Sequence, residues 1–253
     1  MASTKGIVGL FATCLVDLIR PEIGFSTARL LQQAGYKVEV PDGQTCCGQP
    51  HFNSGALVDS VRIAERFVRV FERYEHVVVP SGSCAAMVKI HYPEILADRP
   101  KFLQGAKDIA SRCYELTEFL TDVADIQLSV RHELHCTYHD SCSGFRELGI
   151  CSQPRQLLGQ IDGLTITECN DSTACCGFGG TFCVKYPEIS NSIATEKANN
   201  VDTSGAEVLL GGDLGCLMNI AGMLKRRGSN VRVRHIAEVL AGQTNQPAIG
   251  QPR

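Results

Sequence analysis

The sequence predicts an α/β fold made of two homologous α/β repeats, each with a mostly parallel sheet flanked by helices. Short apolar runs typical of buried strands alternate with amphipathic segments typical of helices, which is characteristic of α/β proteins. The same cysteine motifs recur in the same order in both halves, which indicates an internal repeat. The chain has 253 residues, 44% apolar and 20% charged, so it can bury a full core.

The first repeat begins with a strand, a helix and a second strand. Residues 7–12 form an apolar run that predicts a strand. Residues 21–34 predict a helix, because Pro21 lies in its first turn and Gly35 follows as a stop signal. Residues 36–40 predict a short second strand.

A longer helix and a third strand follow in the first repeat. Residues 57–74 place apolar side chains at helical spacing opposite a charged face. These apolar side chains belong to Val61, Ala64, Phe67, Val68 and Phe71. Residues 76–80 form a continuous apolar run, which is typical of a strand covered on both faces. This order of elements favours a parallel sheet flanked by helices.

The second half of the chain repeats the landmarks of the first half. The pairs are Cys14 with Cys142, Cys46-Cys47-Gly48 with Cys175-Cys176-Gly177, Cys84 with Cys216, and residues 115–120 with residues 235–240. Chance recurrence in a cysteine-rich chain is the alternative, and the shared order argues against it. We therefore expect an N-terminal repeat at residues 1–127, a C-terminal repeat at residues 128–243 and a flexible tail at residues 244–253.

Charge and hydropathy exclude several classes of protein. The formal net charge is −3 and the basic residues are scattered, so nothing indicates a nucleic-acid partner. No apolar run is long enough to span a membrane. Residues 1–19 weakly resemble a signal peptide but lack a small-residue cleavage pattern, so we expect a buried first strand and a cytoplasmic protein. The sequence contains neither a Walker motif nor a dinucleotide-binding fingerprint.

The chain has thirteen cysteines, which is many for its size. Their odd number and the lack of a recognisable export signal favour metal-binding or redox-active thiols over a disulfide framework. Four cysteines directly follow predicted strands, namely Cys14, Cys84, Cys142 and Cys216. Because open α/β folds build their sites at the carboxyl ends of the strands, we expect these cysteines to converge there within each repeat.

Each Cys-Cys-Gly sequence places two adjacent thiols before a glycine. Neighbouring side chains point to opposite faces of a strand, but they can converge in a turn. A glycine in such a turn permits positive φ, and its backbone N–H can approach the sulfurs. Cys-x-x-Cys spacing serves a single tetrahedral zinc better than adjacent thiolates do, whereas an iron–sulfur cluster presents several metal corners.

Each repeat supplies four thiolates, the usual number for an iron–sulfur cluster. The predicted ligands are Cys14, Cys46, Cys47, Cys84, Cys142, Cys175, Cys176 and Cys216. Zinc at the same positions, a redox pair of vicinal thiols and inert buried cysteines are the alternatives. Inert burial is the interpretation for the five cysteines without a repeat partner, namely Cys113, Cys136, Cys151, Cys169 and Cys183.

Two histidines and a glycine-rich turn are candidate auxiliary groups. His51 follows the first Cys-Cys-Gly, and His139 precedes Cys142 by three residues. Either histidine could ligate a cluster or donate a hydrogen bond to its sulfurs, and an ordinary loop histidine is the alternative for both. The turn at residues 177–180 could offer backbone amides to an anion or a sulfide, or could simply permit a tight bend.

Five motifs carry a resemblance to a known family. They are CCGQPHFNSG, PSGSCAAMVKIHYP, HDSCSGFRELGI, CCGFGGTF and DLGCLMNIAG. These motifs resemble the lactate utilization protein A family over residues 7–241. More broadly, they resemble the cysteine-rich CCG domain that occurs in heterodisulfide reductase and in the iron–sulfur subunits of glycolate oxidase and anaerobic glycerol-3-phosphate dehydrogenase.

The resemblance implies an iron–sulfur electron-transfer subunit of a cytoplasmic system that oxidises L-lactate to pyruvate. It also implies lactate utilization B- and C-type partner proteins, the first of which carries ferredoxin-type clusters. The chain shows no hydride acceptor of its own, so we expect a non-catalytic or co-catalytic subunit of an L-lactate dehydrogenase complex.

The sequence departs from the wider family at one position in each repeat. The family's last motif is Cys-x-x-Cys, but Ser81 and Asp213 stand in its first place. Oxygen is a harder donor than sulfur and is less favoured by iron–sulfur centres, although either side chain could still assist. The resemblance to heterodisulfide reductase would imply a non-cubane cluster, whereas four thiolates per repeat favour one [4Fe–4S] cluster in each.

Overall fold

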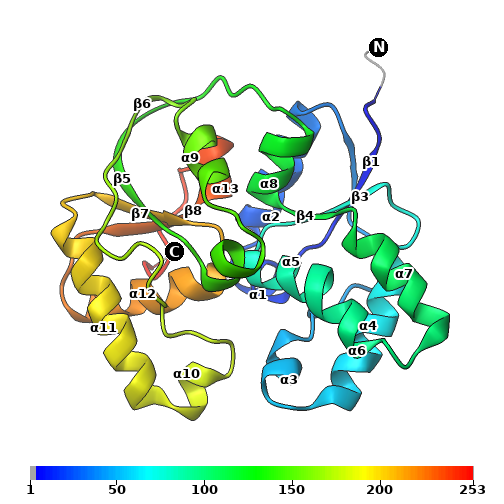
Figure 1. The fold of residues 1–253 in the computed structure, drawn as a ribbon. Helices are drawn as coiled ribbons and strands as arrows, with labels where there is room; N and C mark the ends of the chain where they lie inside the picture. The colour runs from blue at the N-terminus through cyan, green and yellow to red at the C-terminus, as the bar shows by residue number, and fades with distance from the viewer. Residues whose placement is uncertain (1–3, 253) are drawn as a thin grey trace. The chain divides into compact units, whose positions relative to one another are not determined.

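The computed structural model describes residues 4–252, drawn in Figure 1. The chain divides into two compact units, unit 1 at Met1–Ile126 and unit 2 at Gln127–Arg253. Each unit contains one four-stranded parallel sheet flanked by helices, so the predicted α/β fold class is confirmed.

Unit 1 is built on strands β1 (Ile7–Leu10), β2 (Lys37–Glu39), β3 (His76–Val79) and β4 (Cys113–Glu115). The strands lie in the order β2-β1-β3-β4 and every neighbouring pair is parallel. Parallel neighbours require a crossover between strands, and the helices of the unit supply it. β1 and β3 form the centre of the sheet, and both are almost wholly buried, as continuous apolar runs predict.

The helices of unit 1 are short except for three. They are α1 (Cys14–Ile19), α2 (Glu22–Gln33), α3 (Gln49–Asn53), α4 (Leu57–Phe71), α5 (Gly82–Ala86), α6 (Tyr92–Ile95), α7 (Pro100–Ala110) and α8 (Leu116–Glu118), with π-helical turns η1 (Met87–His91) and η2 (Phe119–Val123). The expected helix over residues 21–34 is α2, with Pro21 as its N-cap. Gly35 follows it at φ 93°, a left-handed value that suits a helix stop.

Helix α4 confirms the periodicity expected over residues 57–74, although it ends at Phe71. Ala64, Phe67, Val68 and Phe71 are buried on one face of α4. The Phe67 ring packs edge-on against Phe11, with ring centroids 5.0 Å apart. This aromatic contact joins the helix to the chain that leaves β1.

Unit 2 is built on strands β5 (Arg131–His139), β6 (Asp162–Ile166), β7 (Val208–Gly211) and β8 (Arg232–His235). Their order is β6-β5-β7-β8, again with every neighbouring pair parallel. This is the strand order of unit 1 repeated, with β5 in the place of β1 and β7 in the place of β3. Unit 2 therefore has the same topology as unit 1.

In the described part of the chain, unit 2 has fewer helical segments than unit 1, and most of them also connect the strands of a parallel sheet. They are α9 (Ser152–Leu158), α10 (Phe182–Lys185), α11 (Pro187–Thr203), α12 (Leu214–Arg226) and α13 (Ile236–Leu240), with a π-helical turn η3 (Ser143–Glu147). Among residues 4–252, no helix is both long enough and apolar enough to cross a membrane.

The strand order brings the cysteine motifs of each unit to one place. In unit 1 the chain leaves β1 for β2 on one side and then crosses to β3 on the other, so the order reverses between β1 and β3. Open α/β sheets bind their ligands at the carboxyl ends of the strands where this reversal occurs. The segments that carry the cysteines begin at these strand ends in both units.

The C-terminal segment packs against unit 2, although the sequence predicted a flexible tail at residues 244–253. Ala248 and Ile249 are buried, and the Ile249 N–H donates a hydrogen bond to the Val233 carbonyl oxygen over 2.8 Å. The Arg234 guanidinium also donates to the Gln246 carbonyl oxygen over 2.7 Å. The described part of this segment is therefore docked, because its few apolar residues cover the edge strand β8.

Candidate metal centres

Four cysteines of unit 1 converge at the carboxyl end of its sheet. Cys14 is the first residue of α1, Cys46 and Cys47 lie in the turn before α3, and Cys84 lies in α5. The Sγ atoms of Cys14 and Cys46 are 3.7 Å apart, and Cys47 is hydrogen-bonded to both Cys46 and Cys84. The four sulfurs thus form one connected group, which we call the unit 1 quartet.

The cysteines of the unit 1 quartet differ in pKa because their sulfurs hydrogen-bond to one another. The pKa of Cys46 lies far below its ordinary value because Cys14 and then Cys47 hydrogen-bond to its sulfur. The same hydrogen bonds, with burial, raise the pKa of both Cys14 and Cys47. The Cys46 thiolate is therefore stabilised, while Cys14 and Cys47 stay protonated. A bound cation would allow all of these thiols to be deprotonated, because metal-bound thiols lose their protons.

The turn at Cys46-Cys47-Gly48 has the conformation expected from its glycine. Gly48 adopts φ 82°, and its N–H donates to Cys46 Sγ over 3.4 Å. The buried Tyr92 hydroxyl donates to the Cys47 carbonyl oxygen over 2.9 Å. These two hydrogen bonds fix the conformation of the turn. The Tyr92 hydroxyl also supplies the hydrogen-bond donor that the Cys47 carbonyl oxygen needs.

Unit 2 brings together the corresponding four cysteines. Cys142 follows β5, Cys175 and Cys176 lie in the loop after β6, and Cys216 lies in the first turn of α12. Cys175 is hydrogen-bonded to Cys142 and Cys176, and Cys176 is also hydrogen-bonded to Cys216. The pKa of Cys175 is lowered by the hydrogen bonds from Cys142 and then Cys176, as it is for Cys46 in unit 1. These four sulfurs form the unit 2 quartet.

The second Cys-Cys-Gly turn is more constrained than the first. Gly177 adopts φ 80°, and a Cβ on it would lie 2.7 Å from the Ser190 carbonyl oxygen, so only glycine fits. Its N–H donates to Cys175 Sγ over 3.3 Å, and the Phe178 N–H donates to Cys176 Sγ over 3.4 Å. Backbone donors of this kind stabilise negative charge on sulfur.

Asn219 of α12 holds the carbonyl of the unit 2 turn. Its side-chain amide donates to the Cys176 carbonyl oxygen over 2.8 Å, as Tyr92 does for Cys47 in unit 1. Two different side chains therefore fix the second cysteine of the turn, each from the helical segment that follows the last cysteine of its quartet.

The auxiliary residues expected from the sequence occupy different kinds of position. His51 is exposed in α3, and it lies close enough to Cys46 to contribute to the lowered pKa of that thiol. Ser81 is the N-cap of α5, where its hydroxyl accepts a hydrogen bond from the Cys84 N–H over 3.4 Å. Asp213 is the N-cap of α12. A hydrogen bond with Cys176 lowers the pKa of Cys216, but burial and then the Asp213 carboxylate outweigh it and raise that pKa.

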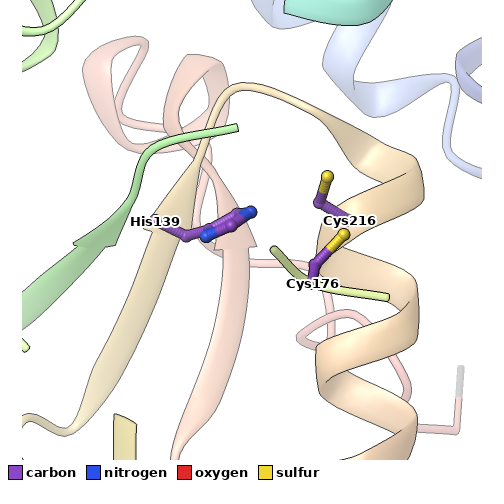
Figure 2. Close-up of side chains that lie close together, drawn as sticks. All are labelled: His139, Cys176 and Cys216. Carbon is purple, nitrogen blue, oxygen red and sulfur yellow. The ribbon is translucent and has the colours of Figure 1, made fainter. Parts of the chain in front are cut away.

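His139 lies at the end of β5 and is fully buried, so it is not an ordinary loop histidine. One of its ring nitrogens and the Sγ atoms of Cys176 and Cys216 all lie within 4.8 Å of one another. Figure 2 shows the ring beside the two sulfurs. Burial and then nearby Lys197 lower the pKa of His139 to about 3, so the ring is neutral and can accept a metal.

The five cysteines without a repeat partner are not part of either quartet's chain of hydrogen bonds. Cys113 in β4, Cys136 in β5 and Cys169 are buried, as expected for inert core thiols. Cys183 is half-buried and donates to the Gly180 carbonyl oxygen over 3.5 Å. Cys151 is exposed, so the expectation of burial is wrong for this residue, which lies just before α9.

Three further residues beside the quartets were not predicted from the sequence to belong to a site. They are Tyr92, Asn219 and Lys197. Lys197 lies on the buried face of α11, between Ala194 and Val201, where an apolar residue would be expected. A lysine on an otherwise apolar helical face was the available signal, whereas Tyr92 and Asn219 look like ordinary helix residues.

The donor set of each quartet fits a thiolate-bound metal or cluster. Sulfur is a soft donor, the turns supply N–H groups to the sulfurs, and at least one sulfur in each quartet carries a lowered pKa. Thiolates on one tetrahedral zinc lie about 3.8 Å apart, given a Zn–S distance of about 2.3 Å. The 3.7 Å between Cys14 and Cys46 resembles that spacing, and ligands of separate iron atoms would stand further apart.

Comparison with known proteins identifies the family. The cysteine-rich domain family named CCG matches residues 8–89 and 136–221, one match in each unit. The chain is 46% identical to lactate utilization protein A of Bacillus subtilis (strain 168), over 92% of this chain and 98% of that protein. It is 43% identical to lactate utilization protein A of Halalkalibacterium halodurans, over 93% of this chain and 97% of that protein.

A solved structure shares the fold. The crystal structure of a hypothetical protein from Helicobacter pylori matches 99% of this chain with a TM-score of 0.69 and 12% sequence identity. The match covers 51% of that protein, so this chain spans about half its length. At this identity the likeness concerns the fold alone. Taken together, the two matched repeats and the near full-length relatives show that the chain belongs to the lactate utilization protein A family of cysteine-rich CCG domain proteins.

Proposed function

We propose that this chain is an iron–sulfur electron-transfer subunit of a system that oxidises L-lactate to pyruvate. The observation that carries the proposal is the pair of four-cysteine quartets, one at the sheet edge of each unit. The name of its relatives, lactate utilization protein A, supplies the metabolic context.

The eight quartet cysteines would hold two clusters, one in each unit. When bound, an iron–sulfur cluster supplies reversible one-electron transfer. The chain's own residues orient the ligands: Tyr92 fixes the Cys47 carbonyl, and Asn219 fixes the Cys176 carbonyl. The backbone N–H groups of Gly48 and Gly177 stabilise the negative sulfurs that such a cluster requires.

The proposed role is that of a subunit that accepts and passes on electrons. The sequence shows no dinucleotide fingerprint, so oxidation of lactate is assigned to a partner that holds the hydride acceptor. Proteins of the lactate utilization B and C types are the proposed partners. Thirteen unbridged cysteines suit the reducing cytoplasm, where we place the complex.

A zinc-stabilised module is the second candidate, and one observation favours it. The 3.7 Å between the sulfurs of Cys14 and Cys46 is close to the spacing in a tetrahedral zinc site, about 3.8 Å. Zinc has no redox chemistry, so this candidate predicts a protein that binds partners without exchanging electrons. Elemental analysis separates the two candidates directly.

The test begins with the full chain purified without oxygen. We expect iron and acid-labile sulfide in about equal amounts, and visible absorption that bleaches on reduction. L-lactate should bleach it only after the B- and C-type proteins are added. A folded protein that stays free of iron after anaerobic reconstitution contradicts the proposal, and stoichiometric zinc in its place supports the second candidate.

A further inference from the structure

The two quartets have different surroundings at the same place in the fold. Phe11 stands three residues before Cys14, and His139 stands three residues before Cys142. Phe11 immediately follows β1, and His139 ends the equivalent strand β5. Both side chains are fully buried. A buried histidine in unit 2 therefore takes the place of a buried phenylalanine in unit 1.

The neighbouring helix carries a matching exchange. The buried residues of α4 are Ser60, Ala64, Phe67, Val68 and Phe71, and those of α11 are Ser190, Ala194, Lys197, Ala198 and Val201. The spacing is identical, so Lys197 occupies the position of Phe67. In unit 1 the two aromatic rings touch, with centroids 5.0 Å apart. In unit 2 a histidine and a lysine replace that aromatic pair.

Lys197 is fully buried and held in one position. Its ammonium donates to the carbonyl oxygens of Asp171 over 2.9 Å and of Ser172 over 2.7 Å. Burial lowers the pKa of Lys197, and the thiols of Cys169 and Cys176 together with the carboxylates of Asp140 and Asp171 oppose that shift. The positive charge of Lys197 therefore lies beside the sulfurs of unit 2.

His139 is buried without a well-formed hydrogen bond to its ring. Among residues 4–252, neither ring nitrogen has a partner in hydrogen-bonding geometry, although the Ser172 carbonyl lies near enough to affect the pKa of the ring. A structural histidine in a core normally satisfies at least one nitrogen, because an unpaired buried polar atom is unfavourable. One nitrogen lies within 4.8 Å of both Cys176 Sγ and Cys216 Sγ, and Figure 2 shows the ring near the two sulfurs. A metal atom held by those sulfurs would supply the missing partner.

We infer that His139 is a fifth ligand of the centre in unit 2, which makes that centre chemically different from the all-thiolate centre of unit 1. The inference rests on the proposed function, because it assigns the histidine to the proposed iron–sulfur centre. Imidazole is an established ligand of such clusters, and as a neutral ligand it adds no negative charge to the centre. The buried positive charge of Lys197 raises the reduction potential of this centre, because it stabilises the reduced, more negative state. The centre of unit 2 should therefore have a higher reduction potential than the centre of unit 1 and should be reduced first.

The test uses the full chain with the Cys46→Ser substitution, which should remove the metal centre of unit 1. The protein is purified without oxygen and loaded with ⁵⁷Fe. Mössbauer spectra should show one iron site with a distinct isomer shift, and this site should disappear in His139→Phe, which copies unit 1. The reduced protein labelled with ¹⁵N-histidine should show nitrogen coupling by pulsed electron paramagnetic resonance.

Two further variants keep the test decisive. His135→Gln is the matched control, because His135 lies on the same strand but contacts Thr167 at 2.8 Å, and it should leave the spectra unchanged. His139→Cys replaces the imidazole with another ligand and serves if His139→Phe does not fold. Bound iron and sulfide without nitrogen coupling and without any spectral change in the His139 variants overturns the inference alone. Wild-type protein without iron and sulfide overturns the proposed function and this inference together.

Discussion

The Tyr92 hydroxyl donates a hydrogen bond to the Cys47 carbonyl oxygen over 2.9 Å, within the core of unit 1. Tyr92 is almost completely buried, and the π-helical turn η1 separates it from α5, which carries Cys84. The contact therefore connects the last segment of the quartet with its Cys-Cys-Gly turn. Unit 2 makes the equivalent contact with Asn219 and Cys176.

Tyr92→Phe should destabilise unit 1 by about 1–3 kcal/mol, because it leaves the buried Cys47 carbonyl without its donor. Denaturant unfolding of the metal-free chain measures the change in free energy. Tyr186→Phe is the control, since Tyr186 is 55% exposed. Equal effects from the two variants would show that the Tyr92 hydrogen bond does not stabilise the turn.

Cys46→Ser should remove the centre of unit 1 and leave that of unit 2, because the two quartets share no residue. Iron and sulfide per chain should fall to about half, given equal clusters in the two units. Cys151→Ser is the control, because Cys151 is exposed and outside both quartets. Loss of all iron in Cys46→Ser would favour a single shared site.

Gly177→Ala should destabilise the chain more than Gly205→Ala does. Both glycines adopt positive φ, 80° and 71°, so each alanine should cost about 1–2 kcal/mol in backbone strain. Only at Gly177 would the added Cβ also lie 2.7 Å from a backbone carbonyl oxygen, whereas nothing lies within 4 Å at Gly205. Thermal unfolding of the metal-free variants measures both costs, and equal losses would contradict the steric argument.

The stability of unit 1 should fall as pH rises from about 4.5 to about 7 through the titration of Glu115. Burial raises the pKa of Glu115 to about 7, so the folded state favours the protonated carboxyl. Its contribution is therefore full below the unfolded pKa and is lost as pH passes the folded pKa, on the order of 3 kcal/mol in all. Glu115→Gln should abolish this part of the pH dependence of the free energy of unfolding, measured with denaturant. If the variant kept the same pH dependence as the unchanged chain, the assignment to Glu115 would be wrong.

Lys197→Met should make the centre of unit 2 harder to reduce, because a buried positive charge beside Cys176 is lost. A redox titration of the anaerobic protein measures the midpoint potential. Lys185→Met is the control, since Lys185 lies at the exposed end of α10 and should have little effect. A potential that is the same in both variants would show that Lys197 does not act on the centre.

The repeated topology and the grouping of the cysteines follow from local patterns. Apolar runs predict the buried strands, and the strand order then determines where Cys14 and Cys84 lie. The turn geometry is also local, since Gly48 follows two adjacent thiols and adopts the expected positive φ.

Other features depend on contacts through space that no local pattern specifies. The pairing of His139 with Lys197 joins a strand end to a helix 58 positions later, and it is visible only when the two units are compared. The hydrogen bond from Asn219 to Cys176 is of the same kind. The docked C-terminal segment was missed because a few apolar residues in a polar stretch decide its position.

The contact between Ile249 and Val233 has a consequence for how the molecule avoids self-association. β8 is the last strand of its sheet, and an open strand edge is a template for pairing with another chain. By accepting the Ile249 N–H, the Val233 carbonyl is no longer available to a neighbouring molecule. A polypeptide shortened to residue 243 would leave that edge bare, so its solutions should scatter more light at high concentration than those of the intact chain.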